Sequence, residues 1–242
     1  MASTSLRIVI LTGAGVSAES GIRTFRAIDG LWEEHRVEDV ASPEGFAADP
    51  ELVHRFYNER RRHLLDAETQ PNAAHEALAR LESELDGQVL VVTQNIDDLH
   101  ERGGSRNVIH MHGDLLKSRC GDCGAVVETL GDTSVDDRCS RCSGRMRPHI
   151  VWFGETPLRM EETFSALESC ELFAAIGTSG TVYPAAGFVR IARSAGAHTV
   201  ELNLGDSEIS ADFDEKRAGP ASELVPRWVG EVLASGRQPH RT

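Results

Sequence analysis

The sequence predicts an α/β protein: a Rossmann-like parallel sheet domain with a smaller module made of a zinc-binding ribbon and a helical insertion. Short apolar runs alternate with helix-like segments along the chain, starting with LRIVIL at residues 6–11. Such runs are typical of parallel strands that helices cover on both faces. Glycines and polar residues follow these runs, and four cysteines occur as two close pairs. A ligand site at one sheet edge and a separate metal module are therefore expected.

Five buried strands and five longer helices account for most of the chain. The expected strands are 6–11, 89–93, 107–111, 172–176 and 199–204. Apolar residues at helical spacing, with prolines and turn residues near the ends, predict helices at 49–66, 72–85, 159–169, 185–195 and 225–233, the last with Pro226 in its first turn. We expect a single catalytic domain over 1–242, with a Rossmann-like part (1–30, 87–117 and 148–242), a helical insertion (31–86) and a zinc-binding module (118–147).

Composition excludes several classes of protein. The formal net charge of −13 argues against nonspecific binding to nucleic acid, which requires a basic surface. The amino-terminal apolar run is too short for a membrane span or a signal peptide, so we expect a cytoplasmic protein with no membrane partner. The oligomeric state is left open.

The stretch after the first strand, GAGVSAESGIRTFR at residues 13–26, carries the first sign of function. Gly13, Gly15 and Ala18 fit the G-x-G-x-x-A dinucleotide fingerprint, in which glycines let the backbone approach a pyrophosphate at a helix N-terminus. The helix is expected to stop at Gly21. The polar and aromatic segment that follows suggests a mobile loop over the nicotinamide end of a dinucleotide.

Polar residues follow each of the other expected strands. They are Gln94 to Asp97, His112 with Gly113, Gly177 to Ser179, and Asn203. Because the carboxyl ends of parallel strands meet at one sheet edge, these features predict one ligand site. A dehydrogenase needs an acidic residue at the end of its second strand, and no strand precedes Glu33 and Glu34. This counts against an NAD-dependent oxidoreductase, which remains an alternative.

Two cysteine pairs, Cys120/Cys123 and Cys139/Cys142, are separated by fifteen residues. The spacing is typical of a four-thiolate zinc site. Four protein ligands leave no open coordination position, so the zinc should be structural. Nearby arginines also allow a zinc-ribbon module that binds nucleic acid, although neighbouring aspartates and the net charge disfavour it.

Two histidines, His110 and His112, stand two apart in the third strand, so they share one face. His112 lies at the carboxyl end and precedes a glycine, which favours it as a general base. A histidine with satisfied bonds in the core describes His110 better.

GAGVSAESGIRTFR, TQNID at 93–97 and the His112-Gly113 pair together resemble the signatures of the sirtuins, and the likeness covers most of the chain. The resemblance implies an NAD-dependent protein lysine deacylase that acts on acyl-lysine proteins or peptides. It implies that His112 and Asn95 are catalytic. Implied cofactor contacts are Gly13, Ala14, Gly15, Ser17, Ala18, Glu19, Thr24, Phe25, Arg26, Trp32, Gln94, Asn95, Ile96, Asp97, Gly177, Thr178, Ser179, Asn203, Leu204 and Ala221.

The reaction that the family carries out consumes NAD rather than reducing it. The acyl-lysine carbonyl oxygen attacks C1′ of the nicotinamide ribose, and the general base then deprotonates a ribose hydroxyl. The products are nicotinamide, O-acyl-ADP-ribose and free lysine. The substrate backbone is expected to add as a strand along Val151, Trp152, Phe153 and Gly154. An ordinary loop with Trp152 in the core is the alternative.

The acyl group is suggested by Tyr57 and Arg60, which are three apart and so lie on one side of a helix. Arg60 falls on the apolar stripe, where an unpaired charge is costly. Arg61 and Arg62 are expected on other sides. Y-x-x-R matches class III sirtuins, which remove succinyl and malonyl groups, with Ala41 leaving room for the longer chain. Pairing with a nearby carboxylate of the protein, or a snorkelling side chain, remains the alternative.

Overall fold

A six-stranded parallel sheet forms the larger part of the molecule, confirming the predicted fold class. In this computed structural model the described residues are 6–23, 31–32 and 35–235. The strand order is β11-β10-β9-β1-β4-β5. Their bounds are β1 Leu6–Thr12, β4 Gly87–Thr93, β5 Val108–His110, β9 Leu172–Ile176, β10 His198–Asn203 and β11 Glu215–Ala218. In register, Val9 of β1 stands between Leu90 of β4 and Phe173 of β9.

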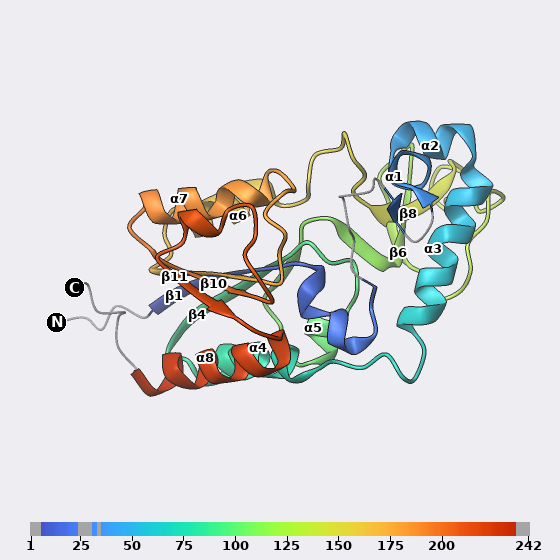
Figure 1. The fold of residues 1–242 in the computed structure, drawn as a ribbon. Coiled ribbons are helices and arrows are strands. Elements are labelled where there is room, and N and C mark those ends of the chain that lie inside the picture. Colours follow the sequence, from blue (N-terminus) through green and yellow to red (C-terminus); the bar gives the residue numbers. More distant parts are fainter. Residues whose placement is uncertain (1–5, 24–30, 33–34, 236–242) are drawn as a thin grey trace.

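Helices cover both faces of the sheet, as the apolar runs predict (Figure 1). One face carries α6 (Met160–Leu167) and α7 (Phe188–Ser194), and the other carries α4 (Ala73–Glu84) and α8 (Ala221–Ser235). Alternate residues of β1 enter the two cores: Val9 packs in the first, and Ile8 and Ile10 pack in the second. Burial on both faces explains why this strand is a continuous apolar run rather than an alternating one.

A smaller lobe lies beyond the carboxyl ends of the central strands (Figure 1). It contains α1 (Val37–Val40), α2 (Pro43–Ala48), α3 (Pro50–Leu64) and a short hairpin of β2 (Leu31–Trp32) with β3 (His35–Arg36). Its second part is an antiparallel sheet of order β7-β6-β8, formed by β6 (Gly113–Cys120), β7 (Val126–Glu128) and β8 (Met146–Ile150). A third apolar core joins α3 to β6 and β8 through Phe56, Tyr57, Leu115, Ile150 and Trp152.

Several predicted boundaries were wrong. The helix expected after the first glycines is instead two 3-10 turns, η1 (Ala14–Val16) and η2 (Ala18–Ser20), which end at Gly21 with a φ of 86°. The last helix begins at Ala221, so Pro226 is in its interior rather than in its first turn. The third strand ends at His110, which leaves His112 in the turn before β6.

The edge strand β11 was not predicted. Its sequence EKRA pairs with β10 at the edge of the described sheet, and its residues alternate between partly buried and exposed, so no apolar run marks it. The remaining short elements are α5 (Leu99–Arg102), η4 (Ala185–Gly187) and η5 (Ser210–Asp212). Among the described residues, no helix combines the length and apolar character needed to cross a bilayer.

Candidate active site

A cavity of about 850 Å³ lies at the carboxyl edge of the central sheet, where the smaller lobe meets it. It brings together most of the predicted site residues. From the sheet side these are Gly13, Ala14, Gly15, Gln94, Asn95, Ile96, Asp97, His112, Gly177, Thr178, Ser179 and Asn203. From the smaller lobe they are Ala41, Tyr57, Arg60, Val151, Trp152, Phe153 and Gly154. One cavity therefore contains both the predicted dinucleotide features and the predicted acyl-binding features.

The turns after β1 and β9 pack backbone against backbone at the cavity wall. Gly15 N–H donates to the Gly177 carbonyl at 2.9 Å. A Cβ on Gly15 would lie 2.7 Å from Gly177 Cα, and one on Gly13 would lie 2.8 Å from the Gly177 oxygen. Gly177 itself has a φ of 62°. Only glycine fits these positions, and a bare backbone is also what a pyrophosphate needs for close approach.

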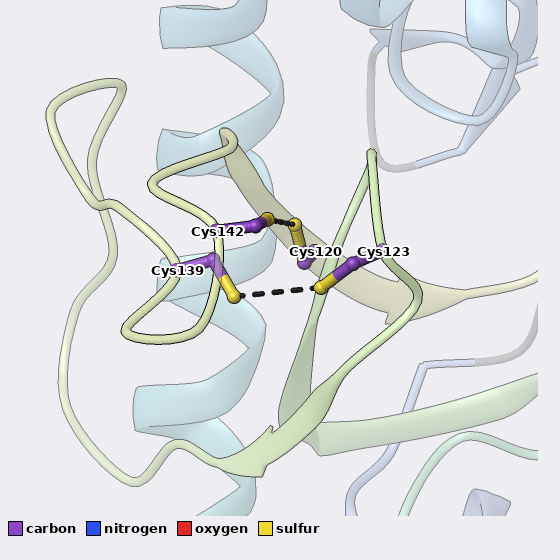
Figure 2. A group of neighbouring side chains, drawn as sticks. All are labelled: Cys120, Cys123, Cys139 and Cys142. Atoms are coloured by element: carbon purple, nitrogen blue, oxygen red, sulfur yellow. Dashed lines mark hydrogen bonds between the residues drawn. The ribbon is translucent and has the colours of Figure 1, made fainter.

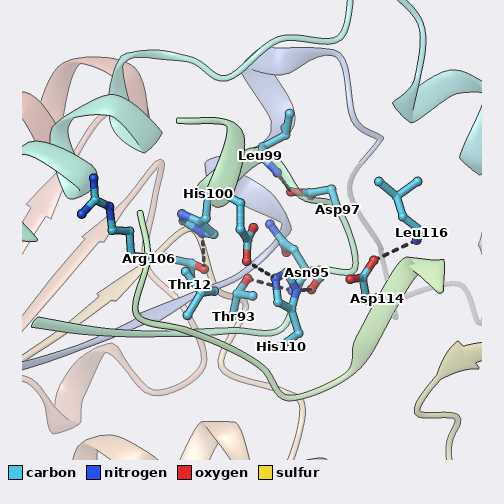
Figure 3. A network of polar contacts seen from close by, with 12 residues as sticks. Thr12, Thr93, Asn95, Asp97, Leu99, His100, Arg106, His110, Asp114 and Leu116 are labelled. Carbon is cyan, nitrogen blue, oxygen red and sulfur yellow. Dashed lines mark hydrogen bonds and ion pairs between the residues drawn. The ribbon is translucent and has the colours of Figure 1, made fainter. Parts of the chain in front are cut away.

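Asn95 is fixed from both its main chain and its side chain. Its N–H donates to Thr93 Oγ1 at 3.0 Å (Figure 3), and its Nδ2 donates to Ser17 Oγ at 3.0 Å. Because Nδ2 donates to Ser17, which is buried behind the cavity wall, this bond sets the orientation of the Asn95 side-chain amide. Ser17 was predicted as a cofactor contact, but it is buried and acts on the cavity through Asn95.

The Asp97 carboxyl is buried beside Asn95, and burial raises its pKa to about 6. Hydrogen bonds from Leu99 N–H, at 3.2 Å (Figure 3), and from the Ser17 hydroxyl partly offset this rise. A carboxyl that exchanges its proton near neutral pH can either donate to or accept from an amide. Asp97 is thus suited to bind a carboxamide.

Two buried histidines support this wall from α4 and α5. His100 Nε2 lies 2.9 Å from Thr12 Oγ1 (Figure 3), and His75 Nε2 lies 3.4 Å from Ser17 Oγ. Burial lowers the pKa of His75 to about 4, so its ring is neutral. Asn72 N–H donates to His75 Nδ1 at 3.2 Å, which leaves the ring proton on Nε2, facing Ser17.

His112 has the geometry of a base. Its Nδ1 lies 3.1 Å from the main-chain carbonyl of Gln94. A carbonyl only accepts, so Nδ1 holds the proton and Nε2 keeps a lone pair. Burial lowers the pKa of His112, although the Gln94 bond opposes this, and the ring stays neutral at pH 7.

His110 is bonded elsewhere, as the sequence suggested. Its Nε2 lies 2.7 Å from Glu101 Oε1, and its Nδ1 lies 3.3 Å from the Asn95 carbonyl (Figure 3). Burial is the largest single effect and lowers its pKa, but the bond to Glu101, the charges of Glu101 and Asp114 and the Asn95 carbonyl together raise it, so the net direction is upward. His110 thus pairs with Glu101 behind the wall.

At the far end of the cavity, Tyr57 and Arg60 project from α3. Tyr57 is fully buried, and its hydroxyl oxygen accepts from Trp152 Nε1 at 3.0 Å. The Arg60 guanidinium lies 3.2 Å over the Phe56 ring and donates to the Phe56 carbonyl at 2.7 Å. Ala41 is buried and lines the same cavity.

Arg61 was expected on another side of the helix than the apolar stripe, but its side of α3 is buried as well. Arg61 is completely buried, and it donates to the Leu115 carbonyl (3.0 Å), Asn58 Oδ1 (2.7 Å) and the Gly131 carbonyl (3.2 Å). The two carbonyl acceptors lie 54 and 70 residues along the chain, so the sequence offered no signal for them. Leu115 and Ile150, which form an apolar part of the cavity wall, were also missed.

The segment predicted to pair with substrate follows β8 as an irregular turn. Three of its four N–H groups already donate within the chain: Val151 to the His112 carbonyl, Trp152 to Glu155 Oε2 and Phe153 to the Ala41 carbonyl. The next N–H, of Glu155, donates to the Trp152 carbonyl. Gly154 has a φ of 88° and open space around its Cα. A peptide strand could therefore pair with the Gly154 N–H and with carbonyls of this segment.

The four cysteines of the two pairs converge as predicted (Figure 2). Their sulfurs all lie within 4.8 Å of one another, with 3.5 Å between Cys120 and Cys142 and 3.7 Å between Cys123 and Cys139. Zn–S bonds of about 2.3 Å in a tetrahedron place sulfurs about 3.8 Å apart. All four are free thiols, so the cluster fits one structural zinc ion.

The remaining predicted contacts lie apart from the cavity or outside the described residues. Glu19 caps α8, accepting from Ser222 N–H at 2.9 Å and from its hydroxyl at 2.7 Å. Leu204 is 78% exposed. Ala18 and Ala221 are absent from the cavity lining that the structure describes. Thr24, Phe25 and Arg26, with the loop expected there, lie outside the described residues, as does the Trp32 side chain.

Comparison with known proteins decides the family. The model of the Sir2 family matches residues 13–184. The chain belongs to the Sir2 family. It is 64% identical over 229 residues to an NAD-dependent protein deacylase of Vibrio vulnificus strain YJ016, covering 94% of each chain, and 61% identical to one of Salmonella typhimurium, covering 94% of this chain and 84% of that one.

Solved Sir2 structures share the fold. A Sir2 homologue in complex with NAD is 39% identical, with a TM-score of 0.87 and coverage of 96% of this chain and 91% of that one. A structure described as Sir2 with a p53 peptide and NAD⁺ is 31% identical, with a TM-score of 0.78 and coverage of 96% and 94%. The Sir2 fold of this chain is therefore shown by sequence and by structure.

Proposed function

We propose that this Sir2 chain is an NAD-dependent protein lysine deacylase that acts on acyl-lysine proteins or peptides and favours acidic acyl groups such as succinyl and malonyl. The observation that carries the proposal is a single cavity lined by the glycine turns, Asn95 to Asp97, His112, Tyr57 and Arg60. Relatives more than 60% identical are named NAD-dependent protein deacylases, and Sir2 structures with NAD share the fold.

In this proposal His112 acts as the general base. The second nitrogen of its neutral ring takes a proton from a ribose hydroxyl, while the Gln94 carbonyl stabilises the imidazolium that forms. Asn95, held by Ser17 and Thr93, orients the ribose, and Asp97 binds the nicotinamide amide. NAD supplies the activated C1′ that accepts the acyl oxygen.

The proposed acyl pocket lies between α3 and β8. Leu115 and Ile150 offer an apolar wall for a methylene chain, and buried Ala41 leaves length for it. The Arg60 guanidinium offers paired donors for a distal carboxylate, and Tyr57 adds a hydroxyl. Acetyl-lysine would use the wall alone, so the pocket should accept it without favouring it.

We also propose a cytoplasmic setting, because four free thiols that bind a metal persist in a reducing compartment. The zinc ion would be structural, because four thiolates leave no position for substrate.

The reaction class is tested by incubating the protein with NAD and a succinyl-lysine or acetyl-lysine peptide. Release of nicotinamide with free lysine is the expected result. An NAD-dependent oxidoreductase would instead produce the absorbance of reduced nicotinamide. Peptide-independent loss of NAD, with no free lysine, would contradict the deacylase.

The acyl preference is tested by Arg60→Met. Removing one partner of a desolvated charge pair costs roughly 3 to 5 kcal/mol, so kcat/KM on succinyl-lysine should fall by about two to three orders of magnitude. Activity on acetyl-lysine should be retained, since that substrate has no carboxylate. An equal fall on both peptides would make Arg60 a structural residue.

A further inference from the structure

A buried carboxylate of β10 holds the loop that follows this strand, residues 204–210, which we call the β10 loop. Glu201 is only 3% exposed, and both of its carboxylate oxygens accept hydrogen bonds from this loop. Its Oε1 accepts from the Ser207 hydroxyl, and its Oε2 accepts from the Ser210 hydroxyl. Burying a charge is costly unless hydrogen bonds satisfy it, and these two bonds are charge-assisted. Glu201 therefore ties the β10 loop to the sheet.

The two serines also connect Glu201 to the main chain of the β10 loop. Ser210 Oγ accepts from Ser207 N–H at 2.7 Å, and Ser207 Oγ accepts from Ile209 N–H at 3.4 Å. Because each hydroxyl oxygen accepts from an N–H group, each hydroxyl proton is donated to Glu201. The carboxylate thus fixes the backbone of the loop as well as its side chains.

The β10 loop packs against the turn after β9. Glu208 N–H donates to the Ser179 carbonyl at 3.1 Å. Gly180 has a φ of 72°, and a Cβ there would lie only 2.6 Å from Ile209 Cγ1. The loop and the turn therefore form one wall of the cavity, lined by Ser179, Gly205, Asp206, Ser207 and Glu208.

The strand order indicates which half of a dinucleotide this wall receives. The neighbours of β1 are β4 on one side and β9, followed by β10, on the other. The glycine turn after β1 suits a pyrophosphate, so the two nucleosides extend to opposite sides of that turn. Asp97, which is suited to a carboxamide, follows β4. The adenosine half of NAD therefore falls on the side of β9 and β10.

We infer that Glu201 is a positioning residue for NAD: through Ser207 and Ser210 it fixes the β10 loop in the shape that receives the adenosine half of the cofactor. The inference rests on the proposed use of NAD and deepens it. Glu201 is absent from the cavity lining that the structure describes, so it acts through the loop. A loosened loop must be ordered when the cofactor binds, and this cost lowers affinity. The adenosine half does not react, so the chemical step should be unaffected.

Glu201→Gln tests this role with little change in side-chain volume. The new amide group offers N–H donors to a serine oxygen that already accepts a backbone N–H, so one of the two bonds to the loop is lost. The Kd for ADP-ribose, measured by calorimetry, and the KM for NAD should both rise by about 5- to 30-fold. At saturating NAD, kcat and the KM for the acyl-lysine peptide should stay within about twofold. A merely structural defect would lower kcat as well.

Asp214→Asn is the matched control, because it alters a similar bond at the other end of the same strand. Asp214 Oδ2 accepts from the Thr199 hydroxyl at 2.9 Å, near the amino end of β10. The Kd for ADP-ribose should be unchanged in this variant. An equal rise in Asp214→Asn and Glu201→Gln would overturn the inference.

Ser210→Ala removes one hydroxyl partner of Glu201 and should also raise the Kd for ADP-ribose. Ser210 is buried and is absent from the described cavity lining, so the variant removes no direct contact with the ligand. If both residues act through one network, the effects of Glu201→Gln and Ser210→Ala should not add. Additive effects, or an unchanged Kd in both variants, would overturn the role of Glu201. Should Glu201→Gln not fold, Ser210→Ala alone decides by its Kd.

Binding of ADP-ribose needs no turnover, which separates this inference from the function on which it rests. A wild-type protein that binds ADP-ribose but releases no free lysine would defeat the proposed deacylase, and the Kd values of the variants would still decide the role of Glu201. A wild-type protein that binds neither NAD nor ADP-ribose would defeat the inference.

Discussion

At His112, a main-chain carbonyl decides which ring nitrogen holds the proton. The Gln94 oxygen faces Nδ1, and Gln94 belongs to the segment that also contains Asn95 and Asp97. The loop after β4 thus orients the proposed base and lines the proposed dinucleotide end of the cavity. A shift of this loop would disturb proton transfer and binding together.

We expect His112→Ala to retain NAD binding. Its deacylation rate should fall by a factor of about 10² to 10⁴, the usual contribution of a general base. Binding by calorimetry and turnover by nicotinamide release measure the two effects. Unchanged turnover in a folded variant would remove His112 from the mechanism.

The same residue predicts the acid limb of the pH profile. Only neutral His112 can take a proton, and burial lowers its pKa below the ordinary 6.5, so kcat/KM should fall only as the pH drops below that value. The Asp97 carboxyl titrates at about 6, in the same region. If His112 causes the fall in kcat/KM at low pH, the residual activity of Asp97→Asn should show the same fall. Its disappearance in Asp97→Asn would instead assign the fall to Asp97.

Residues 60 and 61 mark the limit of sequence reasoning at this scale. Helical spacing placed Arg60 on the stripe with Phe56 and Tyr57, and the structure has it in the cavity wall. Arg61 is nevertheless the more deeply buried of the two, because carbonyls 54 and 70 residues away accept its protons. Helix periodicity carries no information about such distant partners.

Among the elements, those buried on two faces were the easiest to predict. The strands β1, β4 and β9 are central, and their apolar runs agree with the structure to within two residues at either end. The strand β11 lies at the edge of the sheet in the described part of the chain and carries charges, so it was missed. The turns η1 and η2 were mistaken for an α-helix, and η1 packs against Gly177, a tertiary contact that the sequence does not reveal.

The buried His75 ring in the first turn of α4 predicts a pH-dependent stability. The folded state holds His75 neutral, with a pKa lowered from 6.5 to about 4, chiefly by burial. Between these pH values His75 therefore binds more protons in the unfolded chain than in the folded one. The contribution of neutral His75 to the free energy of unfolding is complete above pH 6.5 and is lost as the pH falls toward 4. Integration gives roughly 2 kcal/mol lost from pH 7 to 5.

Urea unfolding of wild type and His75→Gln measures this. From pH 7 to 5 the free energy of unfolding of the wild type should fall by about 2 kcal/mol more than that of the variant. From pH 7 to 8 the difference between the two free energies of unfolding should stay constant. His100, whose ring centroid lies 5.0 Å away and whose pKa burial also lowers, titrates in both proteins. Parallel pH dependences would show that His75 is not held neutral.

At the scale of the whole molecule, the sequence predicted the parallel sheet, the cysteine cluster and the convergence of the strand ends. It could not predict how the metal module attaches to α3. Asn58 Nδ2 donates to the Thr133 carbonyl at 2.8 Å, Thr133 N–H donates back to Asn58 Oδ1 at 2.9 Å, and His54 Nδ1 lies 2.8 Å from Thr133 Oγ1. With the bond from Arg61 to Gly131, these contacts tie the loop before the second cysteine pair to the helix that carries Tyr57 and Arg60.

This attachment predicts that loss of the metal first disturbs the proposed acyl pocket. We expect one zinc ion per chain, and Cys139→Ser or a strong chelator should loosen the module, because a four-thiolate site contributes directly to folding. Amide exchange should then rise in α3 and β6 before it rises in β1 or β4, which lie in separate cores. Deacylation of both peptides should fall, while binding of ADP-ribose at the sheet edge should weaken less. Added zinc should reverse the effects of the chelator. Protein purified without zinc, or exchange that rises uniformly across the chain, would contradict this coupling between the metal module and α3.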